Sequence, residues 1–279
     1  MNDWQVIPEI IGRNASLRMA AMQTNDAVEQ GHHFVVEGEP GSGRRLMARS
    51  AWCRRSPGTR SLFTLDCRMF RSDSAEELLF GERSTCGSHT TIHLGRLNLA
   101  VGGGLLLLHA EDLSLKLQGR LAMALDQYSC RPRNAGVQLL MTCAPSLNAP
   151  LPFHPDLSAM LLRVRVPALR ERVEDIRPIA EAFLRSTSPF ERIRCSQALI
   201  DRLCEYDWPG NVTELRSVLR RLLLEPHNGL LDVRHLADVM CRDETYFALL
   251  QGPHGLFPSP IETGFIHKGP LAESGRSLQ

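Results

Sequence analysis

A glycine-rich segment between an apolar run and a helical pattern contains the residues best suited to chemistry. After the apolar run HFVVE the chain reads Gly38-Glu39-Pro40-Gly41-Ser42-Gly43-Arg44-Arg45. Glycines at this spacing let backbone N–H groups converge on phosphate oxygens, and the N-terminus of the following helix adds its positive dipole end. A strand, a glycine-rich loop and a helix in this order predict a phosphate-binding loop.

Two arginines stand where phosphate loops usually place a lysine and a hydroxyl residue. Arg44 replaces the lysine that reaches the outer phosphates, and its planar guanidinium keeps the charge but is wider. Arg45 replaces the residue that binds magnesium, and a guanidinium cannot ligate a cation. Two interpretations stay open. The loop binds ATP or ADP with Mg²⁺ poorly held, or it is a glycine-rich turn that binds nothing.

Short apolar runs elsewhere in the chain predict the sheet that would position this loop. These runs are residues 33–37, 61–66, 104–109, 137–142 and 162–166. Helical patterns at 14–30, 44–54 and 114–126 lie between them, and Asn14 is suited to cap the first. Strands that alternate with helices predict a doubly wound α/β domain with a parallel sheet.

Beyond residue 168 the pattern becomes helical. Helices are predicted at 172–184, 196–206, 211–224 and 233–240, where Ser196 and Asn211 are suited to cap the second and third. From residue 242 the chain loses periodicity and collects Pro and Gly. The predicted organisation is an α/β subdomain at 1–168, a small all-helical subdomain at 169–241 and a mobile tail at 242–279.

Composition excludes several classes of protein. The net charge of +1 and the pI near 7.7 give the whole chain no strong attraction to nucleic acid or to an anionic membrane. The eight cysteines are scattered without a C-x-x-C pair, which is typical of reduced thiols in a cytoplasmic protein. The N-terminus does not resemble a signal peptide, and no apolar stretch is long enough to span a bilayer.

Several motifs together resemble one family. In chain order they are Ile11-Gly12, the loop at 38–43, Glu77-Leu78-Leu79-Phe80-Gly81, Gly95-Arg96-Leu97, Gly102-Gly103-Gly104, Asp112-Leu113, Leu117-Gln118, Pro167-Ala168-Leu169-Arg170-Glu171-Arg172, Glu174-Asp175-Ile176, Trp208-Pro209-Gly210-Asn211-Val212 and Glu214-Leu215. The chain is similar over most of its length to the central AAA+ domain of bacterial enhancer-binding proteins, the sigma-54-dependent transcription activators.

The resemblance carries expectations for fold and activity. It implies a P-loop NTPase-like five-stranded parallel sheet with a small all-helical lid. It also implies a ring of subunits with ATP bound between them, and hydrolysis that remodels sigma-54 RNA polymerase. By the same resemblance, Ile11 and Gly12 would bind nucleotide together with residues 38–45.

The chain departs from the family where the family performs its chemistry. Leu108 and His109 replace the magnesium-binding Asp and the water-polarising Glu, and leucine offers no oxygen to a metal. In the simpler interpretation Leu108 extends an apolar core strand. The sensor Asn, the two arginine fingers and the lid arginine are replaced by Ala144, His154, Met160 and Thr213, respectively. Because one arginine finger contributes about 10³–10⁵ in rate, these replacements predict a site without catalytic residues.

The family's sigma-54-contacting Gly-Ala-Phe-Thr-Gly-Ala loop also differs here. The corresponding stretch, 82–89, has Cys86 in place of the aromatic tip. Cys86, His89 and His93 have a C-x₂-H-x₃-H spacing that could ligate zinc if a fourth ligand were near. A polar surface loop with chance Cys and His is the preferred interpretation, and no metal site is assigned.

Three functions follow from this combination. The preferred one is a non-hydrolysing regulator that acts through protein contacts, in a homo- or hetero-oligomer, with an active AAA+ relative or with sigma-54 RNA polymerase. The alternative is an ATP-hydrolysing activator that remodels the polymerase. The third is a fold retained without a selected activity. No helix-turn-helix pattern follows Met240, so no independent DNA-binding domain is expected.

Overall fold

The computed structural model describes residues 10–55, 61–69, 72–86, 89–129, 136–145, 153–187, 193–225 and 228–236. The tail predicted at 242–279 lies outside these ranges. None of the helices in the described part combines the length and apolar character needed to cross a membrane.

The centre of the fold is a five-stranded parallel sheet, as predicted, in the order β2-β5-β6-β1-β7. Its strands are β1 (Phe34–Glu37), β2 (Leu62–Asp66), β5 (Gly104–Leu108), β6 (Gln138–Cys143) and β7 (Leu162–Arg165). Strands β1, β5 and β6 are buried throughout, which explains why they are continuous apolar runs rather than alternating ones.

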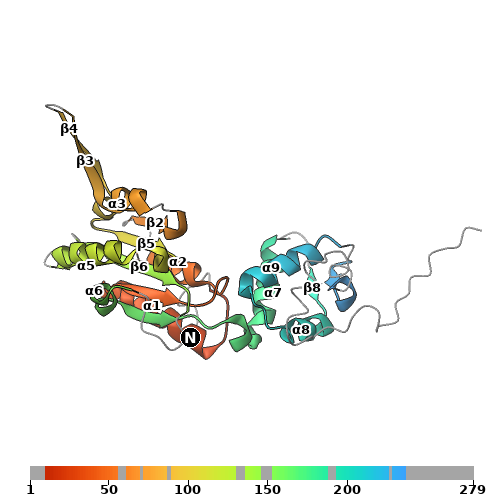
Figure 1. Ribbon diagram of the computed structural model, residues 1–279. Helices are drawn as coiled ribbons and strands as arrows, with labels where there is room; N and C mark the ends of the chain where they lie inside the picture. The colour runs from red at the N-terminus through yellow and green to blue at the C-terminus, as the bar shows by residue number, and fades with distance from the viewer. Residues whose placement is uncertain are drawn as a thin grey trace, which may run out of the picture.

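Helices cover both faces of the sheet (Figure 1). On one face α1 (Ala15–Gln30) and α2 (Arg44–Arg55) pack on side chains such as Phe34 and Leu106. On the other face the core includes residues of four helices, namely α3 (Ser72–Phe80), α4 (Arg96–Leu99), α5 (Leu115–Ser129) and α6 (Pro155–Ala159). Successive strand residues point to opposite faces, so the buried strands β1, β5 and β6 contribute to both cores.

The parallel register brings the carboxyl ends of the strands to one edge. Glu37 of β1 lies opposite Cys143 of β6, and Asp66 of β2 lies opposite Leu108 of β5. The loop that follows β1 therefore lies at the edge where ligands bind in open α/β sheets.

The lid is predominantly helical and has a core of its own. Two 3₁₀ turns, Leu169–Glu171 and Val173–Asp175, precede α7 (Ile176–Thr187), so this helix begins later than predicted. Helices α8 (Gln197–Cys204) and α9 (Asn211–Leu222) follow, and residues 233–236 are helical. A two-residue parallel pair, β8 (Arg194–Cys195) with β9 (Leu230–Leu231), was not predicted.

Two of the three predicted caps are confirmed. Asn14 and Ser196 accept hydrogen bonds from the N–H groups of Leu17 and Leu199, respectively. The prediction for Asn211 is wrong: it is the first residue of α9, and its side chain makes no capping bond. Its amide instead bonds to Glu39 of the loop after β1 and to Leu169 of the turn after β7.

A two-stranded antiparallel ribbon replaces the loop predicted after Phe80. Strands β3 (Gly81–Cys86) and β4 (His89–Leu94) pair with Cys86 opposite His89, and the ribbon stands out from the body (Figure 1). The side chains of Cys86 and His89 lie outside the described residues.

Candidate functional site at the phosphate loop

The glycine-rich loop turns tightly between β1 and α2. Gly41 and Gly43 have φ values of 77° and 109°, in the left-handed region that favours glycine. A Cβ atom on Gly41 would lie 2.2 Å from the carbonyl oxygen of Gly210 and 3.2 Å from Cβ of Thr213. The loop therefore needs glycine at Gly41 both for its turn and because the start of α9 packs directly on it.

Two buried side chains of the loop carry polar atoms without a partner. Ser42 is 3% exposed and Arg44 is 7% exposed, and neither Ser42 Oγ nor Arg44 Nη1 bonds to any described residue. Burial lowers the pKa of Arg44, but a guanidinium stays charged near neutral pH. Because a buried polar group without a partner is costly, these atoms fit a ligand that supplies acceptor oxygens. A phosphate group meets that requirement.

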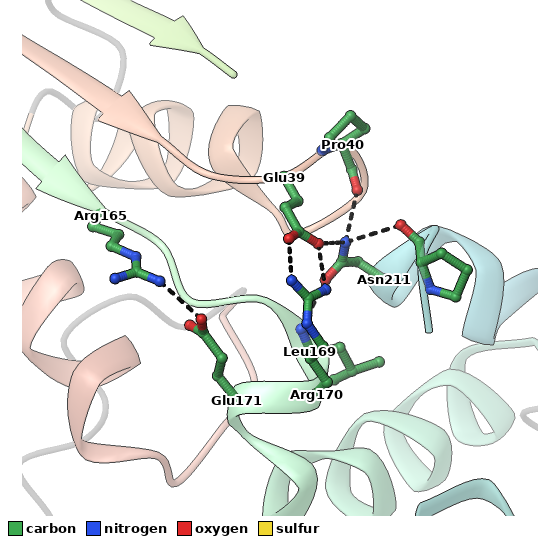
Figure 2. A network of polar contacts seen from close by, with 8 residues as sticks. Glu39, Pro40, Arg165, Leu169, Arg170, Glu171 and Asn211 are labelled. Carbon is green, nitrogen blue, oxygen red and sulfur yellow. Dashed lines mark hydrogen bonds and ion pairs between the residues drawn. The ribbon is translucent and has the colours of Figure 1, made fainter. Parts of the chain in front are cut away.

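The lid is tied to the loop through Glu39 (Figure 2). Arg170 binds both carboxylate oxygens of Glu39, with Nη1 donating to Oε2 at 2.8 Å. Asn211 Nδ2 donates to Glu39 Oε2 at 3.1 Å and to the Pro40 carbonyl at 3.0 Å. The hydrogen bond from Arg170 holds the pKa of the Glu39 carboxyl below its usual value.

The same asparagine reaches the turn that starts the lid. Its Oδ1 accepts from the N–H of Leu169 at 2.7 Å (Figure 2). The N–H of Val212 also donates to the Gly41 carbonyl at 3.1 Å. The phosphate loop, the turn after β7 and the start of α9 are thus held together by one polar network.

A second network joins the N-terminal segment to the lid. Asp175 is fully buried, and its Oδ1 accepts from the N–H groups of Arg13 and Asn14 at 2.5 and 3.2 Å. A Cβ on Gly12 would lie 2.6 Å from Asp175 Oδ2. Arg172 Nη2 donates to the Ser42 carbonyl at 2.7 Å. The structure therefore places the Ile11-Gly12 segment beside the 3₁₀ turn Val173–Asp175, and Arg172, which precedes this turn, contacts the phosphate loop.

The two positions where the family binds magnesium, Leu108 and Arg45, carry no oxygen ligand for a metal. Leu108 is 6% exposed and belongs to the core cluster with α1 and α2, and Arg45 is exposed. The backbone N–H of His109 donates to Thr142 Oγ1 at 3.3 Å, and this residue has a φ of 54°. Within the described part of the chain, no three His, Cys, Asp or Glu side chains are grouped to hold a metal ion.

Glu111 also lies at this edge, where the sequence alone does not predict it. Its Oε1 accepts from the N–H of Ala144 at 2.9 Å, and its Oε2 is buried without a bond to any described residue. Its negative charge opposes the lowering of the pKa of Arg44 by burial. Glu111 belongs to a single 3₁₀ turn, Ala110–Asp112, and no sequence motif marks it.

The remaining replaced positions are His154, Met160 and Thr213, and the ring Nδ1 of His154 is buried at 3.5 Å from Asp156 Oδ2. The His154 backbone N–H donates to Gln118 Oε1 at 2.7 Å, and its ring lies 3.2 Å from where a Cβ on Gly119 would be. Met160 is half-buried against the core, and Thr213 is exposed at the start of α9. None of these three residues is an arginine.

Comparison with protein families agrees with this architecture. The model for the Sigma-54 interaction domain matches residues 10–138, and the model for the AAA+ ATPase lid domain matches residues 170–246. The chain belongs to the sigma-54 interaction domain family of AAA+ proteins. Together the two matches include the phosphate loop, the Glu111 turn and the start of α9.

Curated relatives of this family are transcriptional regulators by name. The alginate biosynthesis transcriptional regulatory protein AlgB of Pseudomonas aeruginosa is 33% identical over 221 residues, which are 73% of this chain and 49% of AlgB. The anaerobic nitric oxide reductase transcription regulator NorR of Vibrio vulnificus is 31% identical over 231 residues, which are 76% of this chain and 45% of NorR. The chain thus spans about half the length of these relatives.

Solved structures of other proteins share the fold. NtrX from Brucella abortus in complex with ADP has a TM-score of 0.68 at 22% identity, over 83% of this chain and 55% of that one. A mutant of RuvB from Thermotoga maritima has a TM-score of 0.55 at 9% identity, over 85% of this chain and 72% of that one. At these identities the likeness concerns the fold alone.

Proposed function

We propose that this chain is a sigma-54-interaction-type AAA+ regulator that binds ADP or ATP, does not hydrolyse it, and acts on transcription through protein contacts. The observation that carries nucleotide binding is the pair of buried, partnerless polar atoms on Ser42 and Arg44, within a loop of phosphate-binding shape. NtrX, which has the same fold, was solved with ADP and with ATP.

The absence of hydrolysis is supported by the side chains around the loop. Leu108 presents an apolar core residue where a metal ligand is needed, and His109 stands where the family has the glutamate. Magnesium normally neutralises the charge that develops during phosphoryl transfer. His154 and Met160 supply no finger arginine to a neighbour. Each replacement would slow hydrolysis, and together they leave no catalytic set.

Protein contacts are the remaining means of action. The names of AlgB and NorR describe transcription regulators, and the family is defined by interaction with sigma-54. The β3–β4 ribbon projects from the body and is available for contact (Figure 1). An assembly with an active AAA+ relative would place a subunit without finger arginines beside a competent site. Such a subunit would lower the relative's ATPase rate.

Two assays on the purified full chain test this proposal. Calorimetric titration with ADP and ATP should show binding, weakened about tenfold or more in Arg44→Gln because a charge-assisted phosphate contact is lost. The matched control is Arg49→Gln, an exposed arginine further along α2, which should leave the affinity unchanged. Phosphate release with ATP and Mg²⁺ should stay at the blank rate.

Three results would contradict parts of this proposal. Steady phosphate release that Gly43→Asp abolishes would establish a working ATPase and overturn the proposal. If neither nucleotide bound, the regulator would have to act without one. Mixing the chain with an active family ATPase tests the last part, because unchanged rates and no complex would argue against an inhibitory subunit.

A further inference from the structure

Glu111 differs from the other carboxylates at the phosphate edge. Three of them each bind an arginine, in the pairs Glu37 with Arg163, Asp66 with Arg68, and Glu39 with Arg170. Glu111 forms no ion pair with an arginine among the described residues, and His109 Nδ1 lies 3.9 Å from its Oε1. Its Oε2 is therefore a carboxylate oxygen at this edge that bonds to no described residue, although the charge of Glu111 acts on Arg44.

The backbone holds this carboxylate close to the phosphate loop. Oε1 accepts from the N–H of Ala144, and the preceding residue, Cys143, accepts from the N–H of Gly38 at 3.4 Å. Gly38 is the first residue of the loop. Two adjacent residues at the end of β6, Cys143 and Ala144, thus link the phosphate loop to Glu111 through one hydrogen bond each.

Two oppositely charged side chains therefore have partnerless atoms at one buried edge. Arg44 Nη1 is a donor and Glu111 Oε2 is an acceptor, and neither bonds to a described residue. Arg44 can be satisfied by a phosphate oxygen, whereas Glu111 can only repel one. Leu108 removes the metal ligand that would otherwise offset this repulsion.

We infer that Glu111 is a specificity-determining residue that makes the phosphate site prefer a nucleoside diphosphate without a metal ion to a nucleoside triphosphate. This inference rests on the proposed nucleotide binding. ADP can supply acceptor oxygens to Ser42 and Arg44 with one phosphate group fewer than ATP. Less negative charge therefore lies near Glu111 when ADP is bound. An additional negative charge placed near a carboxylate in a partly desolvated site weakens binding by about tenfold.

The experiment compares ADP and ATP affinities by calorimetry for the wild-type chain, Glu111→Gln and Asp112→Asn, first with EDTA and then with Mg²⁺. Glu111→Gln keeps an oxygen for the N–H of Ala144, so it removes the charge but not the hydrogen bond. Asp112 is the adjacent exposed acid and provides the matched control. Thermal unfolding of each variant verifies that it is folded.

The expected result is that the wild-type chain and Asp112→Asn bind ADP about tenfold more tightly than ATP, with or without Mg²⁺. In Glu111→Gln the ratio should approach one, mainly because ATP binds more tightly. Equal wild-type affinities, or a ratio that Glu111→Gln leaves unchanged, would overturn the inference alone. The inference would also be overturned if Mg²⁺ strengthened ATP binding in the wild-type chain but not in Glu111→Gln. Glu111 would then be a metal ligand. Binding of neither nucleotide to any variant would overturn nucleotide binding itself.

Discussion

Glu39 of the phosphate loop and Arg170 of the first lid turn form a two-point ion pair, with Nη1 donating to Oε2 at 2.8 Å. The two residues are 131 positions apart in the chain. Asn211 binds the same carboxylate from the start of α9. Together with Asn211 the pair joins three segments where the lid meets the loop of the sheet subdomain.

A double-mutant cycle with Glu39→Gln and Arg170→Gln should give a coupling energy of about 1 kcal/mol in urea unfolding, because the pair is two-point but partly exposed. The control cycle is Arg202 with Glu205, an i, i+3 pair at the end of α8 that the structure joins through Nη1 and Oε2. That cycle should give at most about 0.5 kcal/mol. Equal couplings would mean that Glu39–Arg170 is an ordinary surface pair.

Gly41→Ala should be much more destabilising than Gly31→Ala. Both glycines have left-handed φ values, 77° and 75°, so alanine costs about 1 kcal/mol of backbone strain at each. A Cβ on Gly31 would meet nothing within 4 Å, whereas one on Gly41 would lie 2.2 Å from the Gly210 carbonyl. Urea unfolding should show about 2 kcal/mol more loss for Gly41→Ala. Similar losses would show that α9 does not press on the loop.

Asn211→Ala and Asn211→Gly separate the side chain from the backbone. Both remove the acceptor for the N–H of Leu169 and the donor to Glu39, which should cost about 2–3 kcal/mol because Asn211 is buried. Alanine should cost about 1 kcal/mol more than glycine, since Asn211 has a φ of 55°. If the two variants were equally stable in urea unfolding, the left-handed backbone at α9 would carry no strain for alanine.

Restoring the acidic pair with Leu108→Asp and His109→Glu should not restore hydrolysis, because Ala144, His154, Met160 and Thr213 are unchanged. The aspartate should also cost roughly 3 kcal/mol or more in stability, since it buries a charge in the core with α1 and α2. Leu108→Met, the control of similar volume, should lose less than about 1.5 kcal/mol. Robust phosphate release by the double variant would show that the other sites are misassigned.

Acid should destabilise the chain through His33. Burial lowers its pKa to about 4, and its Nδ1 accepts from the N–H of Leu139 at 3.0 Å. The unfolded histidine has a pKa of about 6.5, so the unfolded state binds the extra proton between these values. Stability should therefore fall as the pH drops from about 6.5 to 4, by at most about 3 kcal/mol.

The control for His33 is His33→Asn, whose amide oxygen can accept the same N–H but does not titrate. Urea unfolding at several pH values between about 7 and 4.5 should show a shallower loss for this variant. An identical pH profile for both proteins would mean that other groups cause the acid sensitivity.

The sheet and the lid helices were predictable because they depend on local hydrophobic pattern. The buried strands are continuous apolar runs, and helices such as α7 present one buried face. The β3–β4 ribbon was missed because its sequences, GERSTC and HTTIHL, are polar and pair through the backbone. The capping role of Asn211 was wrongly predicted because residue type does not reveal which distant partner an amide will take.

The sequence by itself determined which chemical groups stand at the phosphate loop and which are replaced. Arg44, Leu108 and Ala144 are read directly from motif spacing, because side-chain identity does not depend on folding. Only the tertiary structure decided what surrounds Arg44. Strand β5 lies beside β6, and this neighbourhood brings the carboxylate of Glu111 to the N–H of Ala144, 33 residues away. Strand order arises from long-range packing, so no local pattern could show that a carboxylate with an unbonded oxygen would share the edge with that arginine.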